Sequence, residues 1–232
     1  MKYKLYLIPG LMTDERLWNG LIPFITDEIE VVYLKIPNSS DFDEIVETLN
    51  QQIKDTNINL LGFSLGGYIS SYFSCKYPNK VARLFTVSAT PGTTSTEEIQ
   101  RRKQKLIDFQ HKGEFGLDFE KAKSLLEEQN QKDLQLIQTI VDMYNDLGKN
   151  TFITQLTSTF YRVNLFSKLE KLHIPIYMFY SNNDRLLDQK SLKELESKKH
   201  HIKLFKREGT SHNIPLEFPE QLAFYIKEWI KS

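Results

Sequence analysis

The segment Gly62-Phe63-Ser64-Leu65-Gly66 constrains this chain more than any other stretch. Gly-x-Ser-x-Gly alone is a weak signal, because glycine and serine are common in loops. Here, however, it joins an apolar, strand-like run over 58–63 to a stretch over 65–77 whose apolar residues recur at helical spacing. So tight a strand-to-helix turn needs small residues two positions before and after the serine. The turn therefore predicts an exposed Ser64 hydroxyl at a helix N-terminus, where backbone amides favour negative charge.

The rest of the chain alternates strand patterns with helix patterns. Nearly continuous apolar runs, each separated by a helix, are typical of an α/β fold whose mostly parallel sheet has helices on both faces. Helices are expected over Ser40–Lys54 and Pro219–Ile230. We expect six strands, over Tyr3–Ile8, Glu30–Lys35, Ile58–Phe63, Val81–Val87, Ile174–Tyr180 and Ile202–Phe205.

One long stretch, from about Thr93 to Leu172, lacks any strand pattern. It carries amphipathic helical patterns instead, and Gly148 is expected to end one of these helices. We therefore predict a core of residues 1–92 and 173–232 and a helical insertion of residues 93–172 after the fourth strand. The apolar face of the insertion is expected to cover the open end of the sheet. The four predicted helices are Glu97–Gln110, Phe119–Glu128, Lys132–Gly148 and Thr151–Tyr161.

Candidate partners of Ser64 follow two later strands. A serine hydroxyl needs a general base, and the base needs an orienting acid. Asp184 directly follows the predicted fifth strand and His212 the sixth, so both lie at the carboxyl edge of the sheet with Ser64. The chain order Ser, Asp, His is that of hydrolases with this turn. We predict Ser64 as nucleophile, His212 as base and Asp184 as orienting acid, although Asp184 in Asn-Asn-Asp also suits a plain turn.

A nucleophilic serine also needs two backbone amides aimed at the developing negative charge. One is expected from Leu65, directly after the nucleophile. The other is expected from Leu11, because Pro9-Gly10 lets the chain turn sharply after the first strand. Met12 is then expected to line the pocket. The plainer interpretation, in which Pro9-Gly10 only ends a strand, is compatible with this role.

Composition limits the partners. The formal net charge of the 232 residues is +0, which gives no support to nucleic acid or an acidic membrane as a partner. The one cysteine, Cys75, cannot form an internal disulfide, which suits a reducing compartment. The first residues suit a strand better than a signal peptide, and no apolar run approaches the roughly 20 residues of a membrane span. We expect a cytoplasmic protein without a metal or nucleotide cofactor, because neither ligand spacing is present.

These motifs together resemble the α/β-hydrolase fold family over essentially the whole chain. The chain looks closest to the small bacterial serine esterases that include the pimeloyl-carrier-protein methyl ester esterases. The resemblance implies a helical lid at residues 93–172. The family often has His-Gly where this chain has Pro9-Gly10, and Gly-His where it has Ser211-His212. Many members also begin with an antiparallel hairpin, which is expected to be missing here because the first strand starts at about residue 3.

The expected activity is hydrolysis of a small-molecule carboxylic ester through an acyl-enzyme intermediate. A thioesterase, a lyase, a carbon–carbon hydrolase or a ligand-binding member without catalysis are the alternatives on the same fold. Within the predicted lid, Phe115, Met143, Phe152 and Phe160 are expected to line an acyl pocket with Met12, although each also suits the lid's own core.

Positive charges in the predicted lid leave two questions open. Arg101, Arg102, Lys103 and Lys105 form a basic cluster on its first helix. The cluster fits docking of an acidic acyl carrier protein that delivers the substrate, but a solvated helix face explains it as well. Arg162, near the end of the lid, either pairs with an acid of the lid or faces the pocket.

Overall fold

The computed structural model describes residues 2–112, 115–197 and 202–232. Six strands form one parallel sheet in the order β2-β1-β3-β4-β5-β6, which confirms the predicted six-stranded parallel sheet. The ends of β2 and β5 differ slightly from the predicted ones, and β6 extends to Arg207. The strands are β1 (Tyr3–Ile8), β2 (Ile29–Tyr33), β3 (Ile58–Phe63), β4 (Val81–Val87), β5 (Ile176–Ser181) and β6 (Ile202–Arg207).

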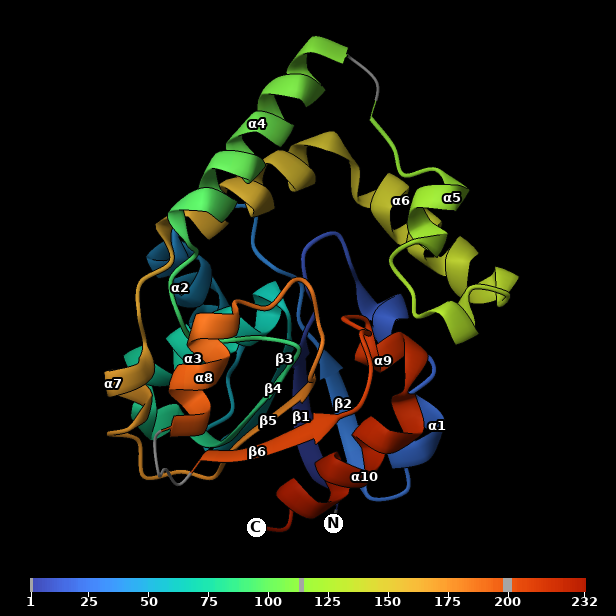
Figure 1. Ribbon diagram of the computed structural model, residues 1–232. Coiled ribbons are helices and arrows are strands. Elements are labelled where there is room, and N and C mark those ends of the chain that lie inside the picture. The colour runs from blue at the N-terminus through green and yellow to red at the C-terminus, as the bar shows by residue number, and fades with distance from the viewer. Residues whose placement is uncertain (1, 113–114, 198–201) are drawn as a thin grey trace.

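Helices cover both faces of this sheet (Figure 1). Successive strand residues point to opposite faces, so in β1 Tyr6 and Ile8 pack into one layer while Leu5 and Leu7 pack into the other. The first layer holds α2 (Phe42–Gln52), α3 (Leu65–Lys76), α7 (Phe166–Leu169) and α8 (Gln189–Ser197). The second layer holds η1 (Glu15–Trp18), α1 (Ile22–Ile25), α9 (Ile214–Glu217) and α10 (Pro219–Trp229).

Local sequence explains where these elements begin and how deeply they lie. Asp41 caps α2 by accepting hydrogen bonds from the Asp43 and Glu44 amides, which have no acceptor inside the helix. The short helix η2 (Pro78–Lys80) leads into β4.

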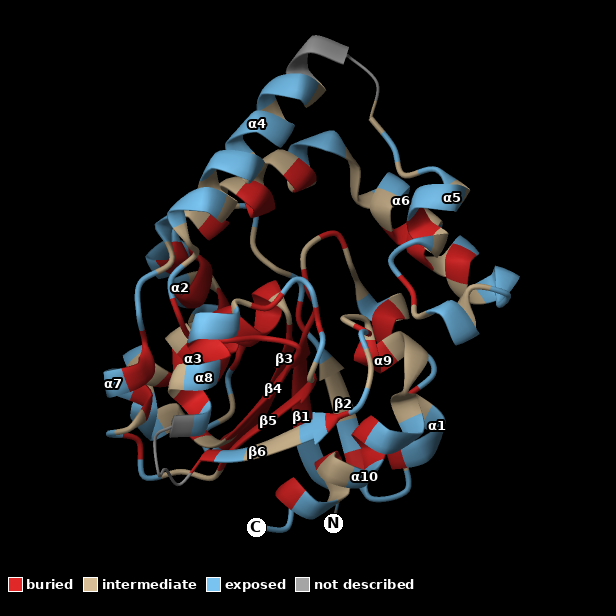
Figure 2. Ribbon diagram, in the orientation of Figure 1, coloured by how far each residue is buried: buried red, intermediate tan, exposed pale blue. Residues whose placement is uncertain are grey.

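Every residue of β3 and β5 is buried, as Figure 2 shows for the centre of the sheet, because helices cover both of their faces. These two buried strands therefore offer rigid supports for the side chains that follow them.

Between β4 and β5 the chain forms an inserted segment, which we define as α4 through η4. Its elements are α4 (Thr96–Lys112), α5 (Phe119–Lys123), η3 (Glu128–Asn130), α6 (Leu134–Ser158) and η4 (Thr159–Tyr161). α4 and α6 arch over the carboxyl edge of the sheet (Figure 1). Gly148 breaks α6 with φ 77° and ψ 173°, at the point where two separate helices are predicted. α7, which follows, packs with the first core layer.

No helix within the described ranges is long and apolar enough to cross a membrane.

Candidate active site

Ser64 sits in the strained turn between β3 and α3. Its backbone has φ 52° and ψ −113°, a conformation that costs a non-glycine residue of order 1–3 kcal/mol. The surrounding glycines are required by space: a Cβ at Gly62 would lie 2.1 Å from the Gly66 carbonyl oxygen, and one at Gly66 would lie 2.1 Å from the Pro9 carbonyl oxygen. The Ser64 amide donates to the Val87 carbonyl at 2.9 Å, which ties the turn to β4.

The structure brings Ser64, His212 and Asp184 together. The His212 Nε2 lies 2.8 Å from the Ser64 Oγ, and the His212 Nδ1 lies 2.7 Å from the Asp184 Oδ2. Asp184 is fully buried, and its Oδ1 accepts a hydrogen bond from the Leu186 amide at 2.9 Å. A carboxylate only accepts hydrogen bonds, so the proton of a neutral His212 belongs on Nδ1 and leaves Nε2 free to accept the Ser64 proton. This arrangement is able to activate a serine hydroxyl.

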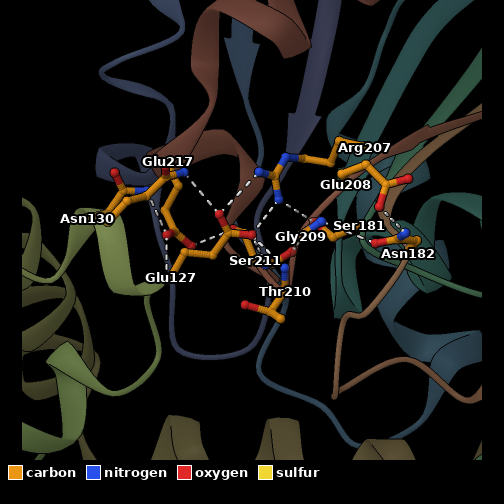
Figure 3. Close-up of polar contacts among 11 residues, drawn as sticks. Glu127, Asn130, Ser181, Asn182, Arg207, Glu208, Gly209, Thr210, Ser211 and Glu217 are labelled. Atoms are coloured by element: carbon orange, nitrogen blue, oxygen red, sulfur yellow. Dashed lines mark hydrogen bonds and ion pairs between the residues drawn. The ribbon is translucent and has the colours of Figure 1, made fainter.

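Glu127, from the inserted segment, holds the loop that carries His212 (Figure 3). Its carboxylate accepts two hydrogen bonds from Arg207, at 2.6 and 3.1 Å, and its Oε1 also accepts from the Thr210 and Ser211 amides at 2.6 and 2.7 Å. Burial opposes ionisation of Glu127. The hydrogen bonds from Arg207 and the two amides nevertheless hold the pKa of Glu127 below its ordinary value. The inserted segment is thus bonded directly to the residues before His212.

A second carboxylate, Glu217 of α9, completes this support (Figure 3). It accepts hydrogen bonds from the Ser211 hydroxyl, from the Glu127 amide at 2.8 Å and from the Asn130 Nδ2 at 2.9 Å. Burial raises the pKa of Glu217 despite these bonds, and the charge of Glu127 raises it further. From β5, the Ser181 hydroxyl donates to the Ser211 carbonyl at 2.6 Å. Ser211 is therefore held by β5, by α9 and by Glu127, which directly precedes η3.

Sequence reasoning missed Glu127, Arg207 and Glu217. Glu127 and Arg207 are 80 positions apart, and no spacing or motif links them. The sequence contains one signal for Glu127, which is its position just before a break between two helical patterns. That signal does not indicate which loop the carboxylate reaches.

The two predicted amide donors lie at the start of α3 and in the loop after β1. Leu65 is the first residue of α3, so its amide has no acceptor within the helix. Among the described residues, no hydrogen-bond acceptor faces the Leu65 or the Leu11 amide. The loop is held in place because the Gly10 amide donates to the Thr13 Oγ1 at 2.7 Å and the Met12 amide to the Gln155 Oε1 of α6 at 2.8 Å. Both amides are thus available to an external acceptor, and their role as an oxyanion hole stays a prediction.

Of the five predicted pocket residues, the structure brings three together. Met12 and Phe152 are buried in one small cluster, and Phe115 packs against it with its ring centre 6.1 Å from that of Phe152. Met143 is fully buried in the second core layer, and Phe160 lies outside both groups, 5.8 Å from the Lys103 ammonium. Beside the loop of Met12 lies a cavity of about 370 Å³, whose lining includes Pro9, Thr13, Trp18 and Gln155.

Comparisons with known proteins identify the fold family. Residues 35–219 match the model of the alpha/beta hydrolase fold family. A pimeloyl-[acyl-carrier protein] methyl ester esterase of Yersinia enterocolitica is 24% identical over 98% of this chain and 93% of its own length. The biotin biosynthesis bifunctional protein BioHC of Teredinibacter turnerae is 33% identical over 38% of this chain, and that match spans 17% of its length.

Solved structures give the same fold. An esterase from Thermogutta terrifontis superposes with a TM-score of 0.84, at 19% identity, over 100% of this chain and 90% of its own. The fold, the turn at Ser64 and a family match over well more than half of the residues lead to one conclusion: the chain belongs to the α/β-hydrolase fold family.

Proposed function

We propose that the protein hydrolyses carboxylic esters through a covalent acyl-enzyme intermediate. The observation that carries this proposal is the placement of the His212 ring between the Ser64 hydroxyl and the buried Asp184 carboxylate. A base within hydrogen-bond distance of a nucleophile, itself oriented by an acid, is the arrangement that serine-dependent acyl transfer requires.

In the proposed reaction, the Ser64 Oγ attacks the ester carbonyl while the His212 Nε2 takes its proton. The Leu11 and Leu65 amides stabilise the oxyanion, and losing one such donor typically costs about 3 kcal/mol of transition-state stabilisation. His212 then protonates the leaving alcohol, which departs and leaves the acyl group on Ser64. A water molecule, deprotonated by His212, attacks the acyl-enzyme. The bond to the Ser64 Oγ breaks, the acid is released and His212 returns the proton to the Ser64 Oγ. Asp184 stabilises the imidazolium in both steps.

The apolar cluster of Met12, Phe115 and Phe152 supports the proposal that the acyl group of the substrate has a hydrocarbon portion. The pimeloyl-[acyl-carrier protein] methyl ester esterases of Yersinia enterocolitica and Neisseria meningitidis support the further proposal that the acyl group is delivered on an acyl carrier protein. The inserted segment, which arches over the sheet edge, would then serve as the lid that selects the substrate.

The test compares the wild-type protein with Ser64→Ala on matched substrates. A series of p-nitrophenyl esters of increasing acyl length, the equivalent thioesters and a carbon–carbon substrate are incubated with each protein. We expect ester cleavage by the wild type and none above background by the variant. Ester hydrolysis that survives unchanged in Ser64→Ala would contradict the proposal, and faster cleavage of thioesters than of esters would favour the thioesterase alternative.

A further inference from the structure

Arg162 follows η4 at the end of the inserted segment and packs against the helix of the nucleophile. Its guanidinium carbon lies 4.6 Å from the centre of the Tyr68 ring, and Tyr68 is one helical turn after Ser64. The Tyr68 hydroxyl donates to the Val163 carbonyl at 3.0 Å and accepts from the Val163 amide at 2.8 Å. These two bonds fix the backbone beside Arg162 to α3, so the position of the guanidinium is set by the fold.

Among the described residues, none is a counter-ion for the charge of Arg162. Within the part of the chain that the structure describes, its side chain makes no ion pair or hydrogen bond, and its Nε is buried without an acceptor. Burial lowers the pKa of Arg162 to about 10, which still leaves the guanidinium charged at neutral pH. Proteins pair nearly all of their buried charges, because an unpaired one is strongly unfavourable. The enclosed Nε of Arg162 thus lacks an acceptor among the described residues, and an anionic ligand would supply one.

Neighbouring charges add to the positive potential. Arg102 of α4 lies close enough for its charge to lower the pKa of Arg162 further. The acid bonded to Arg102 is Glu98, and it is already shared: its carboxylate accepts from Arg102 at 2.7 Å and from Arg101 at 2.5 Å. The single negative charge of Glu98 therefore cannot neutralise Arg101, Arg102 and Arg162 together. The region around Arg162 keeps a net positive charge.

Arg162 and Arg102 are each only half-buried. Although the Nε of Arg162 is enclosed, part of the residue's surface stays accessible, and so does part of Arg102. The planar fork of a guanidinium matches the two oxygens of a carboxylate, and an aromatic ring beneath it holds the fork in one orientation. A carboxylate is the smallest common group that satisfies both the charge and this geometry.

We propose that Arg162, assisted by Arg102, binds a free carboxylate on the substrate, so that the preferred ester is a half-ester of a dicarboxylic acid. This inference rests on the ester hydrolysis proposed above and names its substrate class. It replaces the carrier-bound acyl group considered there, because a thioester to the carrier would occupy the second carboxyl group. The ester carbonyl is attacked at Ser64 while the second carboxylate pairs with Arg162.

The test uses monomethyl esters of dicarboxylic acids from succinate to suberate, each beside its neutral dimethyl ester. The wild type is compared with Arg162→Gln, Arg102→Gln and the matched control Arg101→Gln, whose side chain is 76% exposed. We expect the wild type to prefer half-esters. Arg162→Gln should lower the ratio of kcat/KM for half-ester over diester by about 10- to 100-fold, mainly through KM, because a charge-assisted hydrogen bond is lost. Arg101→Gln should keep the wild-type ratio.

The variant Arg162→Lys distinguishes loss of carboxylate binding from a general disturbance of the structure. It keeps the charge and loses the fork, so we expect an intermediate ratio, and circular dichroism checks that each variant is folded. If Arg162→Gln does not fold, Arg162→Lys and Arg102→Gln carry the comparison. Methyl esters that end in a phosphate instead of a carboxylate form a further arm. A preference for the phosphate would overturn the assignment of a carboxylate.

Binding separates this inference from the proposed function. Calorimetric titration of Ser64→Ala with the half-esters reports the subsite without turnover, and the double variant Ser64→Ala/Arg162→Gln should bind at least tenfold more weakly. The wild type could hydrolyse half-ester and diester at equal rates, and Arg162→Gln could reduce both rates alike. That result would overturn the proposed carboxylate subsite and leave the proposed ester hydrolysis standing. Tight binding through Arg162 with no cleavage of any ester would instead overturn the proposed function.

Discussion

At the scale of single residues, we predict that Asp184 decides which nitrogen of His212 carries the proton. Asp184→Asn offers an amide that can donate to Nδ1 and stabilise the wrong tautomer. We expect kcat to fall by about 10³- to 10⁴-fold while the fold is retained. Asp188→Asn is the matched control, because Asp188 accepts from the Ser191 amide at 2.8 Å at the start of α8. It should keep activity. An Asp184→Asn protein within tenfold of wild-type kcat would argue against this role.

Gly66, like Gly62, occupies a position where the turn leaves no space for a side chain. In Gly66→Ala the new Cβ would meet the backbone oxygen of Pro9 at 2.1 Å, and neither strand nor loop is free to move away. We expect the free energy of unfolding, measured in urea, to fall by at least about 3 kcal/mol. At Gly20 the Cβ would meet only the Pro219 side chain, at 3.3 Å, so Gly20→Ala should cost far less. Equal losses in the two variants would show that the close approach at Gly66 is not real.

At the scale of elements, Glu127 joins the inserted segment to the loop of His212. The side chains of Glu127 and Arg207 are only 10% and 8% exposed, so water screens the charges of this pair weakly. We expect Glu127→Gln to lower the free energy of unfolding at pH 7 by about 2–3 kcal/mol. The pKa of Glu127 lies below its ordinary 4.5 in the folded state, so its contribution exists above pH 4.5 and is lost as pH falls through the folded value. The difference between wild type and variant should therefore narrow in acid.

The same variant should slow turnover more than binding. The Thr210 and Ser211 amides lose part of their hydrogen bonding to Glu127, so His212 is held less firmly against Ser64. We expect kcat to fall with KM nearly constant. Glu128→Gln is the control, because Glu128 is the exposed neighbour on η3 and carries the same charge. A fall in kcat of equal size in the control, or no difference in stability at any pH, would count against the coupling.

At the scale of the whole molecule, the sheet was predictable because its strands are buried. β3 and β5 are buried throughout and mostly apolar, and buried parallel strands appear in a sequence as nearly continuous apolar runs. Placing Ser64, Asp184 and His212 at one sheet edge needed only that topology and the chain order. The ends of β2 were less predictable because it lies at the sheet edge, where its residues are mostly exposed or half-buried.

The supports of the site could not be predicted in the same way. Glu127 meets Arg207, and Gln155 meets the Met12 amide, only because the inserted segment folds back over the sheet edge. Those contacts depend on how α4, α5 and α6 pack, and each amphipathic pattern fixes only which side of its own helix is apolar. The missing counter-ion of Arg162 among the described residues is likewise visible only in three dimensions, because the sequence does not show which acids from other elements its side chain can reach.

The measurement that tests the central claim most directly is labelling with a fluorophosphonate probe, followed by mass spectrometry of the labelled peptides. Wild type and Ser64→Ala are treated side by side, with circular dichroism to show that both are folded. An activated serine predicts covalent modification of the wild type at Ser64 and none of the variant. A folded wild-type protein that takes up no label, or a Ser64→Ala protein labelled as strongly as the wild type, would contradict an active serine at this turn.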